Sequence, residues 1–149
     1  MNEQMKNPSV IKNVGFSLLS EGKTLRIFAH GYSMYPNIKP GSLILIEPIR
    51  VGGPPRPGEI IAIKRESGLV VHRLCRIIKK NGITWYIARG DSNAYSDNPV
   101  KLDKIAGRII RAEGTANNPV PANISANSRP NYFINRLRVI AILAWKKFA

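Results

Sequence analysis

The sequence predicts a mainly β domain, with a short helix before it and an amphipathic helix after it. Short runs of β-branched and aliphatic residues recur between residues 24 and 112, and Gly, Pro or Asn separates them. Many short strands joined by tight turns are typical of a partly closed β-barrel or a sandwich. The chain has 149 residues, enough for one hydrophobic core and too few for two comfortable ones. We therefore expect a single β domain over residues 23–113.

Each expected strand is bounded by turn-forming residues. The strands cover residues 24–30, 42–46, 59–65, 69–79, 83–89 and about 104–112. Residues 51–58 are rich in Gly and Pro, which indicates a loop. Asn81-Gly82 lies between two apolar runs, a strong signal for a tight hairpin.

The N-terminal segment, residues 1–22, reads as a polar tail followed by a short helix. Apolar residues at helical spacing indicate a helix from Ser9 to Leu19, with Ser9 as a possible N-cap and Gly22 ending it. Its apolar run is short and contains Lys12 and Asn13. We therefore expect neither a secretory signal nor a membrane-spanning helix here.

The C-terminal segment combines a linker with a basic amphipathic helix. Residues 114–130 are rich in Asn, Pro, Ser and Ala, which is typical of a linker. In residues 131–149, apolar side chains share one helical face with basic residues around it, and the apolar run Val139–Trp145 is too short to span a membrane. We expect a helix lying on an anionic membrane surface, so that the protein is peripherally attached and otherwise cytoplasmic. A helix packed on the domain, or an oligomer contact, is the alternative.

The net charge of +14 also favours an anionic partner. The basic residues are spread along the chain, and no zinc-finger, RNA-binding or helix-turn-helix pattern is present. No Cys/His cluster has the spacing of metal ligands, so we expect no metal and no cofactor. A membrane surface is therefore favoured over nucleic acid as the partner.

Three separate segments carry residues suited to nucleophilic catalysis. Ser33 follows a glycine turn and precedes Pro36, which holds the backbone extended and would aim the hydroxyl in one direction. His72 interrupts an apolar run, and a turn-rich loop contains Asp91 and Asp97. Serine, histidine and aspartate are the parts of a nucleophile, a base and an orienting carboxylate. An ordinary turn serine and a structural histidine remain the alternatives.

Six short motifs together resemble the signal peptidase I superfamily over about residues 25 to 112. They are Ser33-Met34-Tyr35-Pro36, Pro40-Gly41-Ser42-Leu43-Ile44, Pro57-Gly58-Glu59-Ile60-Ile61, Val70-Val71-His72-Arg73, Arg89-Gly90-Asp91-Ser92-Asn93 and Ile105-Ala106-Gly107-Arg108-Ile109. Because His72 stands before Arg73 where the common bacterial enzymes have lysine, the chain is similar to the histidine type of endoplasmic-reticulum and archaeal enzymes. Those usually begin with a transmembrane anchor, which this sequence does not show.

The resemblance implies a fold, an activity and roles for individual residues. The fold would be that of signal peptidases and LexA-type proteins, and the activity a serine endopeptidase that cleaves after small residues of a secreted or precursor peptide. Ser33 would be the nucleophile, His72 the base and Asp97 its orienting partner, with Asp91 bracing the loop or taking that role instead. Met34 and Pro36 would shape the floor of the cleft. The backbone N–H of Ser33 would donate a hydrogen bond to the oxyanion. Many relatives have a second donor, a hydroxylated residue, at the position where this chain has Gly31.

Three alternatives stay open. A LexA-type self-cleaving regulator would use lysine and would carry a DNA-binding domain and an internal cleavage site, none of which the sequence shows. The same fold could serve as a catalytically idle, membrane-associated peptide-binding module. A basic nucleic-acid-binding β-barrel, with Ser33 and His72 structural, is the third.

Overall fold

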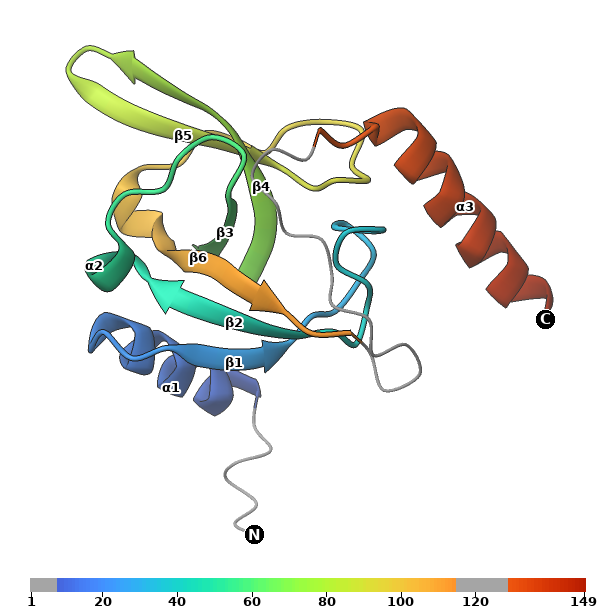
Figure 1. Cartoon of the computed structure of the whole chain (residues 1–149), viewed down its shortest axis with the longest axis horizontal. Helices are drawn as coiled ribbons and strands as arrows, with labels where there is room; N and C mark the ends of the chain where they lie inside the picture. The colour runs from blue at the N-terminus through green and yellow to red at the C-terminus, as the bar shows by residue number, and fades with distance from the viewer. Residues whose placement is uncertain (1–7, 115–128) are drawn as a thin grey trace, which may run out of the picture.

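The computed structural model describes residues 8–114 and 129–149, with side chains from residue 13 onward, and it confirms the predicted mainly β class (Figure 1). One antiparallel sheet of six strands, in the order β1-β2-β6-β3-β4-β5, forms the domain. The strands are β1 Leu25–Phe28, β2 Leu43–Pro48, β3 Ile60–Arg65, β4 Gly68–Lys80, β5 Ile83–Arg89 and β6 Ile105–Ala112. The sheet curls without closing, and it is a single sheet rather than a two-sheet sandwich.

The central strand β3 has both of its faces buried. Ile60 and Ala62 belong to one apolar cluster, together with Met34 and residues of β2 and β6. Ile61 and Ile63 point to the other side and pack with residues of β4 and β5. Successive side chains of a strand alternate between faces, which explains why the first four residues of this strand, Ile60 to Ile63, are all apolar.

Strand β4 changes its partner halfway along its length. Residues Gly68–Arg73 pair with β3, whereas Arg73–Lys80 pair with β5, and a register irregularity marks the change after Leu74. Within the described ranges, the first half of β4 therefore has no strand on its second side. Strand β1 pairs only with β2 among the residues that the structure describes, so it also has one free edge there.

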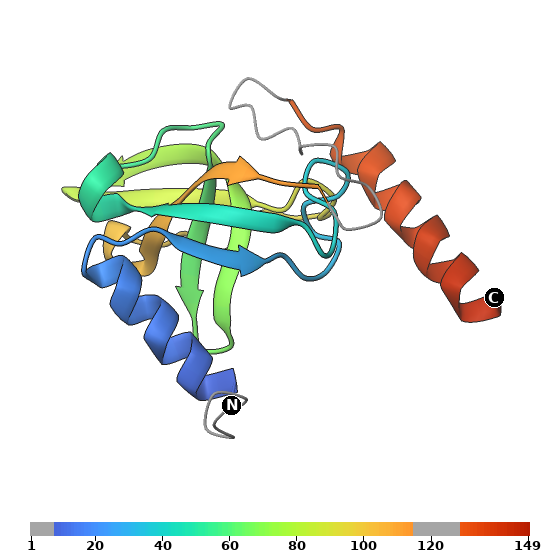
Figure 2. The same cartoon turned by 60° about the horizontal axis from the view of Figure 1, so that its bottom comes forward.

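Helix α1, Pro8–Ser20, covers the start of the sheet beside β1 (Figure 2). It begins one residue before the predicted Ser9, with Pro8 at its first turn, where the missing N–H costs nothing. At its end Gly22 has a φ of 84°, and the N–H groups of Gly22 and Lys23 donate to the carbonyls of Leu19 and Leu18. This is the glycine-dependent helix end that the sequence predicted.

Two turns show how local sequence shapes the connections. Asn81 and Gly82 have φ values of 52° and 74°, which gives the β4–β5 hairpin a turn with positive φ at both central residues. The loop predicted at 51–58 instead starts within a short helical turn, α2 Ile49–Gly52. Arg108 on β6 accounts for it, because its guanidinium donates to the carbonyls of Gly52, Gly53 and Pro54.

Helix α3, Tyr132–Phe148, extends away from the sheet at the end where the loop after β5 lies (Figure 1). The side chain of Asn131 caps it by accepting a hydrogen bond from the Ile134 N–H at 3.1 Å. Most of the predicted linker, residues 114–130, lies outside the described residues. No helix in the described ranges is both long and apolar enough to cross a bilayer.

Candidate active site

His72 and Asp97 form a close pair near the end of the half of β4 that pairs only with β3. The Nδ1 atom of His72 lies 2.5 Å from Asp97 Oδ2. The His72 side chain is nearly buried at 9% exposure, and that of Asp97 is 18% exposed. Because Nδ1 is engaged by a carboxylate, it carries the proton, and Nε2 is left as the acceptor nitrogen. The imidazole therefore has the tautomer that a general base requires.

Asp91, the other candidate partner for His72, is held elsewhere. Its two carboxylate oxygens accept hydrogen bonds from Arg73 Nε and Nη2, both at 2.9 Å. Asn37 Nδ2 donates to the same carboxylate at 2.7 Å. Asp91 is fully buried and Arg73 nearly so. Asp91 thus ties the Ser33 turn, through Asn37, to the strand that carries His72.

Ser33 lies on the turn between β1 and β2, and its main chain is fixed by the loop after β5. The N–H of Ser92 donates to the Ser33 carbonyl at 2.9 Å, and the Ser92 hydroxyl donates to the Tyr32 carbonyl at 2.5 Å. Among the described residues, neither the Ser33 hydroxyl nor its N–H has a hydrogen-bond partner. No hydrogen bond joins Ser33 to His72 in this part of the chain. The hydroxyl and the N–H of Ser33 therefore make no hydrogen bond within the described residues.

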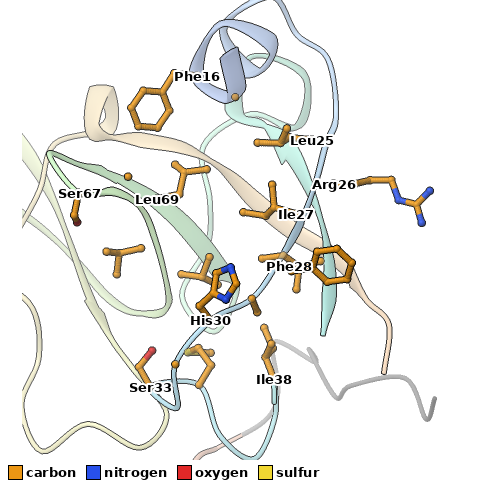
Figure 3. Close-up of a pocket in the computed structure, with 18 of the residues that line it drawn as sticks. Phe16, Leu25, Arg26, Ile27, Phe28, His30, Ser33, Ile38, Ser67 and Leu69 are labelled. Carbon is orange, nitrogen blue, oxygen red and sulfur yellow. The ribbon is translucent and has the colours of Figure 1, made fainter. Parts of the chain in front are cut away.

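Ser33 lines one end of a cavity of about 760 Å³ (Figure 3). Its walls are β1 on one side and the start of β4 on the other, with Phe16 of α1 at the end away from Ser33. Ile27 and Leu69 give it an apolar lining. Of the two predicted cleft residues, Met34 lines this cavity, but Pro36 is not among the lining residues. Pro36 therefore does not form its floor.

The two free strand edges border this cavity. The alternating antiparallel pairs β1-β2, β2-β6, β6-β3 and β3-β4 leave β1 and β4 parallel to each other. Both strands run toward the catalytic candidates, since β1 leads to Ser33 and the first half of β4 ends at His72. An extended peptide laid between them can hydrogen-bond to unpaired backbone groups on either side.

Several residues of this region were not singled out from the sequence. His30 and Ser67 line the cavity, and His30 lies near Ser33 (Figure 3). Asn37 and Ser92 hold the Ser33 turn through their contacts with Asp91 and with the Tyr32 and Ser33 carbonyls. A histidine three positions before the predicted nucleophile was the available signal for His30. Ser92 appeared in the sequence only as part of the Arg89–Asn93 motif and Asn37 gave no signal, because the roles of both depend on contacts with distant segments.

Helix α3 also contacts the loop that carries Asp91 and Asp97. Asn135 is buried, and its Nδ2 donates to the Asp91 carbonyl at 2.9 Å. The Arg89 guanidinium lies 3.6 Å from the centre of the Tyr132 ring and donates to the carbonyls of Asn93 and Ala94. Burial, and then the hydrogen bond with Cys75, raise the pKa of Tyr132 to about 12. The first turns of α3 thus brace the loop that supplies both aspartates.

The arrangement offers an unengaged hydroxyl, a histidine oriented by a carboxylate, and an apolar groove with free strand edges. These are the elements of acyl transfer to serine from a peptide. No three side chains of metal-binding type come together within the described ranges. No protein-family model matches the chain, and a search of curated proteins finds no match either.

Proposed function

We propose that the protein is a serine endopeptidase of the signal-peptidase type, with Ser33 as nucleophile and His72 as base. The carrying observation is the His72–Asp97 pair, in which His72 lies next along β4 after Val71; Val71 and Ser33 both line the cavity, whereas His72 and Asp97 are not among its lining residues. An isolated structural histidine needs no carboxylate at 2.5 Å, and a structural turn serine needs no place in an apolar groove. Both features follow directly if the site performs acyl transfer.

The reaction would proceed in two halves. The Ser33 Oγ attacks the peptide carbonyl carbon while His72 Nε2 takes its proton, and the resulting imidazolium is stabilised by Asp97. Collapse of the tetrahedral intermediate breaks the C–N bond, and His72 returns the proton to the leaving amine. Water then hydrolyses the Ser33 ester with His72 again acting as base.

The Ser33 N–H would stabilise the oxyanion. It donates to no described group, so it is available to the negative oxygen. One such donor is worth about 10²–10³ in rate. Gly31, at the position of the second donor in related sequences, has no side chain to supply it, which predicts slower turnover than an enzyme with two donors.

The free edges of β1 and β4 support an extended peptide as substrate. If the peptide runs parallel to both strands, the residues before its scissile bond occupy the cavity and the carbonyl reaches Ser33 last. Small residues at the positions before that bond, such as alanine, are what the resemblance in sequence implies. We therefore infer that a precursor peptide, held as an added strand, is the substrate.

The test is cleavage of a peptide library with Ala-x-Ala motifs, read by mass spectrometry. Wild type is compared with Ser33→Ala and His72→Ala, and two matched controls come from the same cavity, Ser67→Ala and His30→Ala. We expect cleavage by wild type and both controls, and none by the two site variants. Turnover that survives in Ser33→Ala or His72→Ala would refute the proposal.

A second candidate, a peptide-binding module without turnover, draws on the same groove. Its specific support is the absence of a hydrogen bond between Ser33 and His72 among the described residues. Fluorescence anisotropy with the same peptides separates the two. Binding with no product from any variant, at enzyme concentrations close to that of the peptide, would favour the module.

A further inference from the structure

The apolar side of α3 faces away from the domain. Its large side chains are strongly exposed, from 44% for Ile134 to 87% for Phe148. With about 100° between successive residues of a helix, these side chains fall within a single arc of roughly 140°, and only Leu143, 49% exposed, lies outside that arc. The residues of this outward face are Phe133, Ile134, Leu137, Ile140, Ala141, Ala144, Trp145 and Phe148.

The side of α3 toward the domain is narrow and partly polar. It consists of Tyr132, Asn135, Val139 and Ile142, which are buried or half-buried and spaced three and four residues apart. Lys146 continues this line, and its Nζ lies 2.5 Å from the Tyr32 hydroxyl. The helix is thus attached by its less apolar side. The helix therefore contacts the domain, but the described residues leave its apolar arc exposed.

Basic residues border the outward face on both sides. Arg136 and Lys147 lie along one margin and Arg138 along the other, all exposed, and α3 has no acidic residue. A second copy of α3 laid on this face would bring like charges together. An anionic lipid surface would satisfy the basic margins while the apolar arc enters the acyl region. Trp145 and Phe148 suit the boundary between the two.

We infer that α3 docks the protein on an anionic phospholipid bilayer through this outward face. The inward contacts then hold the candidate active site close to the lipid. Asn135 is bonded to the Asp91 carbonyl, and Lys146 contacts Tyr32, the residue before Ser33. Resting on the proposed function, this geometry favours precursor peptides that are themselves held at a membrane surface.

The test measures partition onto vesicles without relying on cleavage. The full chain with Ser33→Ala and Trp85→Phe is used, so that Trp145 is the single tryptophan. It is mixed with vesicles of phosphatidylcholine alone or with phosphatidylglycerol, and partition is measured by flotation alongside Trp145 emission. We expect a blue shift and binding only with phosphatidylglycerol, weakening as salt is added.

Substitutions on the outward face identify the surface responsible. Leu137→Glu and Ile140→Glu should each weaken partition at least tenfold, since one buried aliphatic side chain alone accounts for about that factor. Val51→Glu is the matched control, because Val51 is 62% exposed on α2, at a distance along the chain from α3. It should leave partition nearly unchanged.

Three results would overturn the inference. The first is no binding to the mixed vesicles at low salt, and the second is an equal loss in Val51→Glu. The third is a dimer in sedimentation velocity that Ile140→Glu dissociates, which would assign the outward face to a second copy. Vesicle binding is measured with a Ser33→Ala chain, so it does not depend on cleavage. Failure of the peptidase proposal would therefore leave the binding result unchanged, and failure of vesicle binding would leave the cleavage result unchanged.

Discussion

Replacing Asp91 should cost far more stability than replacing Asp97. Asp91→Ala removes three hydrogen-bond contacts made by a carboxylate with no exposed surface, and it takes the Asp91 charge away from the buried Arg73 guanidinium. Breaking one partner out of a buried ion pair costs about 3–5 kcal/mol. Asp97→Ala removes a single hydrogen bond, the one to His72 Nδ1, which is worth about 0.5–1.5 kcal/mol.

Guanidinium chloride unfolding, followed by circular dichroism, measures both changes. For a chain of this size, the Asp91→Ala loss corresponds to a melting temperature lower by roughly 6–20 °C. Asp91→Asn keeps the side-chain shape and an acceptor, so it provides a milder variant that folds if Asp91→Ala does not. Peptide cleavage is expected to rank the residues the other way, with folded Asp97→Ala the less active. Equal stability losses for the two alanine variants, or a larger loss for Asp97→Ala, would refute the assignment of Asp91 to Arg73.

Three other outcomes are expected. Asp97→Asn should lower kcat by up to about 10⁴ with little change in KM, since the wrong imidazole tautomer is favoured; stopped assays over a range of peptide concentrations measure it. Gly90→Ala should lower kcat, because the added Cβ would lie 2.7 Å from the Ser33 carbonyl oxygen and would displace the turn that carries Ser33. Gly15→Ala is the control: its Cβ meets only a side chain, at 3.3 Å, so this variant should retain activity. The pKa of Tyr132 is higher in the folded protein than in the unfolded chain, so its contribution to stability is present below pH 10 and is lost as pH rises toward about 12. The free energy of unfolding, measured between about pH 9 and 12, should therefore fall more steeply for wild type than for Tyr132→Phe.

Much of the fold was predictable because the signals for it are local. The uninterrupted apolar run of β3 indicates a strand buried on both faces, and Asn81-Gly82 specifies the hairpin by its backbone preference. The end of α1 depends on a single glycine, Gly22. The short helical turn α2 was missed, because the guanidinium that holds it comes from Arg108 on a distant strand.

The candidate site shows why chain order alone does not assign partners. His72 and Arg73 are neighbours in β4, so their side chains point to opposite sides of the sheet. Each takes one of the two aspartates of the following loop, Asp97 for His72 and Asp91 for Arg73. Sequence identified the four residues, but the pairing depends on which side of the strand each loop segment passes.

From the sequence, the apolar face of α3 was expected to lie on a membrane, but the residues that attach the helix to the domain were not identified. Its amphipathic pattern predicts an apolar face, and such a face normally packs on the domain. Here the inward contacts are made by Tyr132, Asn135 and Lys146 with partners from three other segments. Polar contacts between segments far apart in the chain leave no periodic signal, so the structure was needed to identify the side by which the helix is attached.

An open pair of strand edges also affects how copies of the protein behave toward one another. An unpaired edge can accept a strand from another molecule as readily as a substrate, and this is a common route to aggregation. Strand β1 limits the risk by its length of four residues and by the exposed Arg26. The net charge of +14 adds mutual repulsion, whose reach shrinks to about 10 Å at 0.1 M salt. The colloidal stability of concentrated solutions therefore depends on ionic strength, and the excess of lysine and arginine opposes association of copies through these open edges.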